Sequence, residues 1–235
     1  MQREIEKKYL LKDKTEREAL VKNLQALYPK MALKGTKTVI SYFYEKAQSK
    51  DQILAAGKAL LDEEQLAALS ELVEKCDEIM VKCRSIDDTK YFAVKGAASG
   101  EDAVHAANRM EYEVILDQDL ESINQAIVSA GIVLVSKWSS LRDFYSLDQN
   151  LKADIEFVAG YGHKAELELV IPDGDSVETA VATIDQLADK LGLYYASDAL
   201  MGRMYNYYNQ HWQDYFNTDN VFSDQVWKEL GRDFS

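Results

Sequence analysis

Polar and apolar positions alternate along much of the chain, in short runs rich in β-branched and aromatic residues. Alternation with a period of two is typical of half-buried strands. It predicts eight strands, at residues 3–11, 37–45, 78–86, 90–96, 108–117, 132–147, 151–159 and 164–171. Most of them follow one another at hairpin distance, with turns at Asp87-Asp88 and at Gly160 to Gly162, so we expect antiparallel pairing. This pattern favours an eight-stranded antiparallel β-barrel.

Apolar residues at helical spacing separate these strands and fill the C-terminal tail. Helices are predicted over residues 15–27, in two halves of 50–76 that break near Asp62, over 119–130, and from Ser176 to Gly192. Thr15 and Glu18 would form a capping box at the start of the first helix. The aromatic tail is predicted to be helical and packed on the barrel. With no linker and no internal repeat, we expect an α+β fold, with a barrel domain over residues 1–196 and a C-terminal helical extension over residues 197–235.

The composition matches a soluble globular protein, with 47% hydrophobic and 29% charged residues. The net charge of −13 argues against nucleic-acid binding, which usually needs a basic surface. No apolar run reaches the ~18 residues that a membrane span requires, and the first ten residues lack the apolar core of a secretory signal. Cys76 and Cys83 fit neither a disulfide framework nor a zinc site. We therefore expect a cytoplasmic monomer or homodimer that binds a small molecule and neither a nucleic acid nor a membrane.

Several predicted strands are charged on one face and apolar on the other. Residues two apart share a strand face, and the pattern Glu-x-Glu occurs three times. Two carboxylates at this spacing lie about 7 Å apart and repel. A solvated sheet face explains any single strand more simply, but three such pairs indicate a bound divalent cation, since hard cations such as Mg²⁺ and Mn²⁺ take several carboxylate oxygens. The candidate metal ligands are Glu4, Glu6, Glu111, Glu113, Asp154, Glu166 and Glu168.

Cationic residues share faces in the same way, as Lys82 and Arg84 do on one strand and Lys152 does beside Asp154. Lysine and arginine bind phosphate oxygens strongly. A metal that bridges phosphate oxygens, with a carboxylate to position the attacking water, suits phosphoryl transfer. The candidate substrate-binding residues from this pattern are Lys8, Lys82, Arg84, Lys95 and Arg109, and the candidate catalytic residues are Glu4, Glu6 and Lys8.

The segment Glu4-Ile5-Glu6-Lys7-Lys8 resembles the N-terminal Glu-x-Glu-x-Lys signature of the CYTH superfamily, the triphosphate tunnel metalloenzymes. The order that follows over residues 3 to 171 is also similar: Lys82 and Arg84, Lys95-Gly96, Arg109 with Glu111 and Glu113, then Lys137, Asp154 and Glu166/Glu168. The resemblance implies an eight-stranded antiparallel tunnel, in which acidic residues hold Mg²⁺ or Mn²⁺ and basic residues bind a triphosphate.

The resemblance also implies an enzyme, a metal-dependent triphosphatase acting on inorganic tripolyphosphate or on a nucleoside or thiamine triphosphate. Two alternatives stay open. A class IV-type adenylate cyclase, which makes cyclic AMP from ATP, needs the same metal and phosphate contacts, and a non-catalytic module would bind polyphosphate without turnover. No group of residues in the sequence selects a base, which favours hydrolysis of a small triphosphate.

The sixth predicted strand departs from the family pattern. The family usually has Lys-x-Arg there, whereas Lys137 is followed by Trp138 and Ser139. Arg142 is the nearest arginine, but it lies an odd number of residues from Lys137 and would reach the same face only through a β-bulge. Either Lys137 serves that wall alone, or a bulge brings Arg142 to it.

Overall fold

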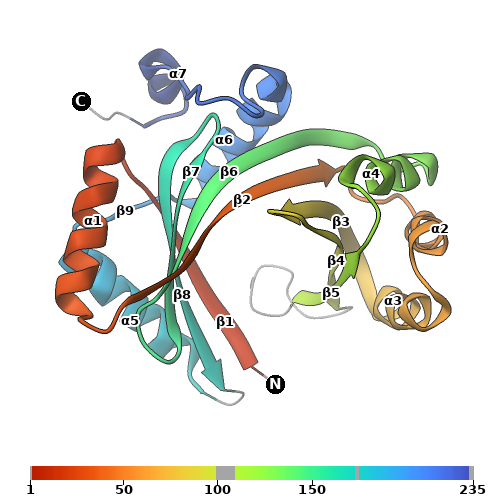
Figure 1. The fold of residues 1–235 in the computed structure, drawn as a ribbon, viewed down its shortest axis with the longest axis horizontal. Coiled ribbons are helices and arrows are strands. Elements are labelled where there is room, and N and C mark those ends of the chain that lie inside the picture. The colour runs from red at the N-terminus through yellow and green to blue at the C-terminus, as the bar shows by residue number, and fades with distance from the viewer. Residues whose placement is uncertain (1, 99–108, 173–174, 233–235) are drawn as a thin grey trace. The chain divides into compact units, whose positions relative to one another are not determined.

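The computed structural model describes residues 2–98, 109–172 and 175–232. The chain divides into two compact units (Figure 1). The first comprises Met1–Thr38 and Ser139–Ser235, and the second comprises Val39–Trp138. The first unit contains both chain termini, and the second is inserted between its two segments. The predicted boundary at residue 196 stays a prediction.

The first unit contains the end strands of the sequence and the C-terminal helices. Its elements are β1 (Gln2–Leu10), α1 (Lys14–Leu27), β7 (Leu151–Val158), β8 (Gly162–Pro172), α5 (Val177–Leu191), β9 (Tyr194–Tyr195), α6 (Asp198–His211), the 3-10 helix η2 (Trp212–Asp214) and α7 (Asp224–Glu229), with parts of β2 (Ala32–Tyr44) and β6 (Leu134–Ser146). Helices α1 and α5 run along one side of β1, β7 and β8 (Figure 1). Side chains at odd-numbered strand positions, among them Ile5, Ile155 and Leu167, are buried with Leu20, Leu24 and Ile184 of these helices.

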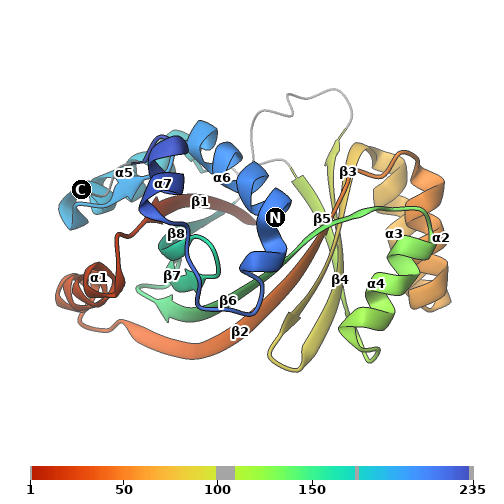
Figure 2. The same cartoon turned by 90° about the horizontal axis from the view of Figure 1, so that it is seen from above.

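The second unit contains α2 (Lys50–Leu60), α3 (Glu63–Lys75), β3 (Cys76–Ile86), β4 (Thr89–Ala98), β5 (Arg109–Leu116) and α4 (Leu120–Ser129), with the remaining parts of β2 and β6. All three helices lie on the same side of β3, β4 and β5 (Figures 1 and 2). Residues 50–76 form the predicted pair of helices, and Asp62 is the N-cap of α3, where it accepts a hydrogen bond from the Gln65 N–H at 2.8 Å.

The strands are hydrogen-bonded in the order β5-β4-β3-β2-β6-β7-β8-β1-β9. The α+β class and the antiparallel pairing are therefore confirmed. Within the described residues, β5 and β9 each have a neighbour on one side only, so closure of the strands into an eight-stranded barrel is not confirmed. The short ninth strand, which the sequence pattern did not predict, pairs Tyr195 with Tyr9 of β1.

The first helix begins differently from the prediction. Its N-cap is Asp13, whose carboxylate accepts the Glu16 N–H at 3.0 Å, so the capping box of Thr15 and Glu18 was wrong. Aspartate is as good an N-cap as threonine, and the N-cap at Asp13 begins the helix one residue before Thr15. The predicted ends of the helix from Ser176 to Gly192 are confirmed, since Ser176 caps α5 and Gly192 ends it in the left-handed conformation.

The C-terminal tail forms α6, η2 and α7 and is part of the first unit. Its chain pairs with Gly160 through two backbone bonds, from Gly160 N–H to the Asn220 carbonyl at 2.8 Å and from Phe222 N–H to the Gly160 carbonyl at 2.7 Å. Gly160 has φ +85°, and a Cβ there would lie 2.7 Å from the ring of Tyr208. A larger residue at this turn would therefore displace the tail.

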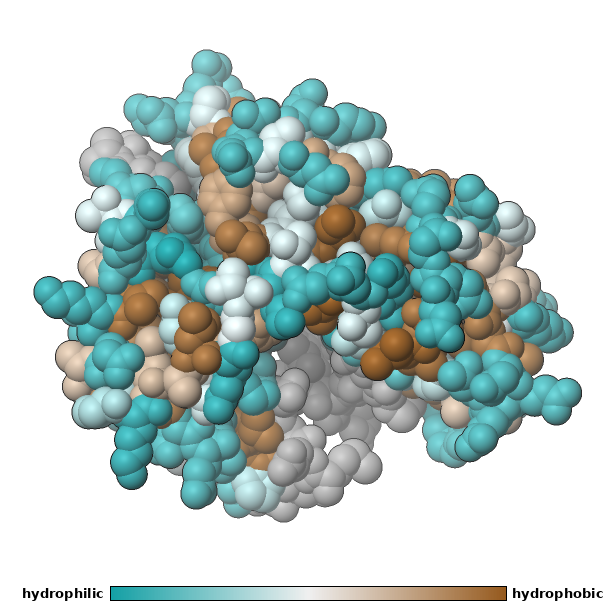
Figure 3. Space-filling view, viewed as in Figure 1, coloured by the Kyte–Doolittle hydropathy of each residue, from teal (hydrophilic) through white to brown (hydrophobic). Residues whose placement is uncertain are grey.

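Hydrophilic side chains cover much of the surface seen in Figure 3, with scattered hydrophobic residues between them. Such isolated exposed apolar residues are normal on soluble proteins. Within the described part of the chain, none of the helices has the length and hydrophobicity to cross a bilayer.

Candidate functional site

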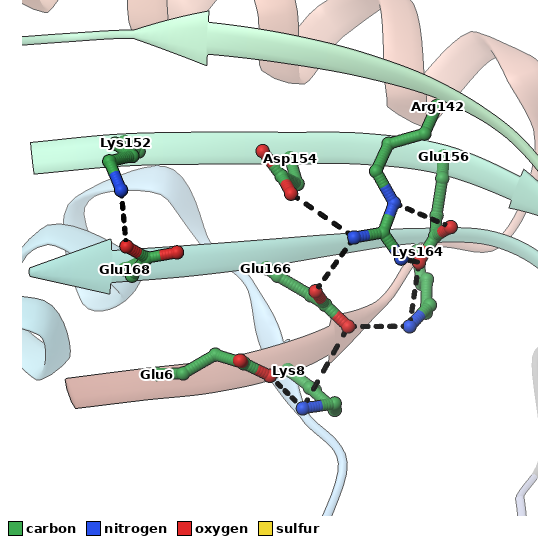
Figure 4. A network of polar contacts seen from close by, with 9 residues as sticks. All are labelled: Glu6, Lys8, Arg142, Lys152, Asp154, Glu156, Lys164, Glu166 and Glu168. Carbon is green, nitrogen blue, oxygen red and sulfur yellow. Dashed lines mark hydrogen bonds and ion pairs between the residues drawn. The ribbon is translucent and has the colours of Figure 1, made fainter. Parts of the chain in front are cut away.

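A charged face lies on β1, β8, β7 and β6 of the first unit (Figure 4). It consists of even-numbered residues, because the odd-numbered ones on these strands point into the core against α1 and α5. Its described members are Glu6, Lys8, Arg142, Lys152, Asp154, Glu156, Lys164, Glu166 and Glu168. The apolar contacts on the opposite side of the sheet hold these strands in register, and the register brings the charges together.

Arg142 is the centre of this charged face. Its Nε and Nη2 donate to the two carboxylate oxygens of Glu156 at 3.0 and 2.9 Å. Its Nη1 lies 3.2 Å from Asp154 Oδ2 and 3.7 Å from Glu166 Oε2. One guanidinium therefore touches three carboxylates on two strands (Figure 4). These carboxylates outweigh the effect of burial, which favours the neutral form, and the pKa of Arg142 is raised.

Two lysines, the buried Lys164 and the half-buried Lys8, complete the centre of the charged face. Lys164 Nζ lies 2.7 Å from Glu156 Oε1 and 2.6 Å from Glu166 Oε1. Lys8 Nζ lies 3.8 Å from Glu166 Oε1 and also contacts Glu6. Burial raises the pKa of Glu166, but Lys164, Lys8 and Arg142 together hold it well below its usual range. Burial is the main cause that lowers the pKa of Lys8.

Like charges also oppose one another directly on this face. Glu6 of β1 pairs in register with Glu168 of β8, and Asp154 of β7 pairs with Glu166. Glu168 accepts from Lys152 at 2.6 Å. Burial, together with the neighbouring carboxylates Glu166 and Glu156, raises the pKa of Asp154 to about 6 in spite of Arg142. Directly opposed like charges destabilise a sheet, so this arrangement indicates a role other than stability.

The second unit has a smaller charged face of its own on β3, β4 and β5. Arg84 pairs with Glu113 at 2.6 Å and lies over the ring of Tyr91, 5.3 Å from its centroid. Lys82 Nζ lies 4.9 Å from the centroid of the Phe43 ring. Lys95 shares this face, opposite Met80 and Glu111 in the strand register. The other face of β3 and β4, with Val81, Cys83 and Val94, is buried.

Lys137 and Arg142 occupy opposite faces of β6. Lys137 Nζ lies 3.1 Å from Glu121 at the start of α4 and 4.3 Å from the centroid of the Tyr42 ring, so it faces that helix. From Ser140 to Ser146, β6 pairs with β7 without a register shift, and this register places Arg142 opposite Glu156 on the charged face of the first unit. The sequence prediction concerned the face of Lys137, which Arg142 would share only through a bulge, and it stays a prediction.

The remaining predicted residues are only partly described. The backbones of Glu4 and Arg109 pair with Val170 and Ala97. The side chains of Glu4, Arg109 and Glu111 lie outside the described part of the structure.

Two members of the charged face, Glu156 and Lys164, were missed in the sequence. Each has the parity of a residue that was found, Glu156 that of Asp154 and Lys164 that of Glu166. Extending the alternation by one further repeat, two residues, on each strand would have found both.

The oxygen donors on the charged face belong to the class that Mg²⁺ and Mn²⁺ prefer. Yet among the described side chains no group of three or more aspartate, glutamate, histidine or cysteine residues is gathered so that it could hold a metal. Asp154, Glu156 and Glu166 each contact a cation of the protein instead. The described residues therefore do not by themselves form a metal centre.

No family model and no curated protein matches this chain. Among solved structures, the chain is similar to the PH1012 protein of Pyrococcus horikoshii OT3, with a TM-score of 0.55 and 16% identity over 81% of this chain and 91% of that one. A conserved hypothetical protein of Pyrococcus furiosus aligns with a TM-score of 0.54 and 15% identity, over 81% of this chain and 91% of its own. These two likenesses show the fold.

A protein from Hippeastrum, described as a candidate adenylyl cyclase with a dominant triphosphatase activity, aligns over 83% of this chain and 90% of its own. The identity is 12% and the TM-score 0.49. A likeness of this degree carries no conclusion about activity, so the function is argued from the residues.

Proposed function

We propose that this protein is an enzyme that hydrolyses a triphosphate, either inorganic tripolyphosphate or a nucleoside or thiamine triphosphate. The observation that supports this most directly is the charged face of the first unit, where Lys8, Arg142 and Lys164 project from three different strands. A purely structural sheet face would not gather these charges where Asp154 and Glu166 oppose each other. A polyanion with several phosphate groups would give these cations further partners.

The cations hold the substrate in this proposal. Lys8 and Arg142 donate hydrogen bonds to phosphate oxygens. They also stabilise the negative charge that develops on the leaving pyrophosphate. A carboxylate of the same face orients the attacking water. The water oxygen bonds to the terminal phosphorus as the P–O–P bond breaks, and tripolyphosphate yields orthophosphate and pyrophosphate.

Metal dependence is part of the proposal. Mg²⁺ or Mn²⁺ would supply neutralisation of the negative charge on the phosphate groups. On the first unit the proposed ligands are the carboxylates Glu4, Glu6, Asp154, Glu166 and Glu168. Glu6 and Glu168 are the best placed of the described ones, because they lie opposite each other in the β1/β8 register. On the second unit Glu111 and Glu113 stay predicted metal ligands, and Lys82, Arg84, Lys95 and Arg109 stay predicted substrate-binding residues.

One observation favours a nucleoside triphosphate over inorganic tripolyphosphate as the substrate. The charged face of the second unit carries aromatic rings beside its cations, with Phe43 in edge contact with Trp138 at 5.7 Å between centroids and with Lys82 over Phe43. Such rings can stack on a base. A nucleoside triphosphate is therefore a candidate substrate, for hydrolysis or for cyclisation to cyclic AMP.

Product analysis tests the proposal. The purified protein is incubated with tripolyphosphate, ATP or thiamine triphosphate, each with Mg²⁺ or Mn²⁺, and orthophosphate, pyrophosphate and cyclic AMP are measured. Orthophosphate release supports hydrolysis, whereas cyclic AMP with pyrophosphate supports the cyclase. Binding of a triphosphate without any product would leave only the polyphosphate-binding module.

A further inference from the structure

Glu156 and Lys164 are the most deeply buried members of the charged face. Their residue exposures are 1% and 8%, and they oppose each other directly in the β7/β8 register. A buried charge without a partner is costly, but Glu156 accepts three charge-assisted bonds, two from Arg142 and one from Lys164. The buried charge of Glu156 is therefore compensated, and its side chain is held in place by these bonds.

The contact with Glu156 also fixes the orientation of the Arg142 guanidinium. A guanidinium held by two parallel bonds to one carboxylate cannot rotate about its own axis. Glu156 takes the edge formed by Nε and Nη2, so the Nη1 end points toward Asp154 and Glu166. In the proposed function the triphosphate would bind at that end, where Nη1 contacts the two carboxylates.

We propose that Glu156 is a positioning residue, which holds the Arg142 guanidinium so that its Nη1 end faces the triphosphate, and that Lys164 keeps Glu156 in this position. The inference rests on the proposed function, since it concerns the binding of the same substrate. Neither residue has to touch the substrate. Lys164 contacts both Glu156 and Glu166. It therefore links Glu156, at the Nε edge of the Arg142 guanidinium, to Glu166, at the Nη1 end.

The test is a double-substitution cycle on triphosphate KM. Glu156→Gln keeps the shape of the side chain but removes its charge, and it should raise KM about tenfold, as expected for one charge-assisted contact. The value of kcat should change less, because the reacting groups stay in place. Arg142→Lys cannot form the paired contact and should raise KM by a similar factor. The double variant should be no worse than Arg142→Lys alone, since Glu156 acts through Arg142. Additive effects, or an unchanged KM in a folded Glu156→Gln protein, would overturn the proposal.

Glu156→Asp covers the case in which Glu156→Gln does not fold. It keeps the charge but is one methylene shorter, so it should fold and still raise KM, because the paired contact cannot form at the same place. A KM equal to that of the wild type would contradict the positioning role.

A measurement without substrate separates this inference from the proposed function. The Nε–Hε NMR signal of Arg142, assigned by its loss in Arg142→Lys, should exchange slowly with solvent in the wild type and quickly in Glu156→Gln. Equal exchange rates would overturn the positioning role even if the protein hydrolyses triphosphate. Slow exchange together with no triphosphate binding would overturn the proposed function, and with it the role of Glu156 toward a substrate.

Discussion

Asp154 of β7 and Glu166 of β8 face each other in register, two carboxylates that both contact Nη1 of Arg142. The two differ in their remaining partners. Glu166 also accepts from Lys164 and has Lys8 nearby, whereas Asp154 contacts Arg142. This difference explains why the pKa of Glu166 is lowered and that of Asp154 is raised to about 6, with burial as the main cause for Asp154.

Asp154 should therefore cost stability at neutral pH. Its folded pKa lies above the ordinary value near 4, so the folded state holds the proton more tightly than the unfolded state. The free energy of unfolding should fall as pH rises from about 4 to 6, by up to about 3 kcal/mol from this residue. Asp154→Asn should be more stable than the wild type at pH 7.5 and nearly equal to it at pH 4, as urea unfolding would show. Exposed Asp219→Asn is the control, with no such difference. Equal effects of Asp154→Asn at both pH values would contradict this account.

The two basic residues of β6 should respond differently to substitution. Lys137→Ala removes the contact with Glu121 and the Tyr42 ring, so it should lower the melting temperature slightly and leave triphosphate KM within about twofold. Arg142→Lys should raise KM about tenfold, because lysine cannot reproduce the paired contact. Steady-state kinetics on both variants checks this. A larger KM effect from Lys137→Ala than from Arg142→Lys would mean that Lys137 is the residue that binds substrate.

The reactivity of Cys83 tests which side chains of β3 are buried and which lie on the charged face of the second unit. Cys83 is fully buried between Lys82 and Arg84, and burial raises the pKa of its thiol to about 12. At pH 8 its thiolate fraction is then about a thousandfold below that of a free cysteine. Alkylation should be very slow in the folded protein and fast in denaturant. Rapid modification of Cys83 in the folded protein would place it on the charged face of the second unit, and Lys82 and Arg84 on the other side.

Divalent metal together with tripolyphosphate should stabilise the protein. A ligand that binds only the folded state raises its stability by about 2.7 kcal/mol at a hundredfold excess over Kd. Calorimetric melting with Mn²⁺ and tripolyphosphate should show a clear rise, and Glu6→Gln should reduce it. Lys75→Ala, which breaks an exposed ion pair on α3, is the matched control. The absence of any shift at millimolar concentrations would count against a triphosphate site.

The period of two predicted much of the charged face from the sequence. It placed Glu6, Lys8, Asp154, Glu166 and Glu168 on strand faces that prove to be continuous across β1, β8 and β7. The periodicity could not show which strands are neighbours, because strand order and register depend on contacts between segments far apart in the sequence. The contacts of Arg142 with residues 12 to 24 positions away became visible only in the structure.

Lys137 was assigned to the site by likeness to a family pattern and stays a predicted substrate-binding residue; in the structure it contacts Glu121 of α4. Asp13 caps α1 because its side chain reaches the Glu16 N–H, a competition between neighbouring capping residues that the sequence alone does not settle. Closure of the barrel depends on contacts between distant strands, which local patterns do not describe.

The central claim is that the charged face turns over a triphosphate, and orthophosphate release tests it most directly. Wild-type protein and Glu6→Gln are assayed side by side with tripolyphosphate, with Mg²⁺ or Mn²⁺ and with chelator. We expect metal-dependent release by the wild type and a fall of about two orders of magnitude or more in Glu6→Gln, which keeps its shape but loses one charge. Tight binding of tripolyphosphate, ATP and thiamine triphosphate by the wild type, with no orthophosphate released under any of these conditions, would contradict the claim.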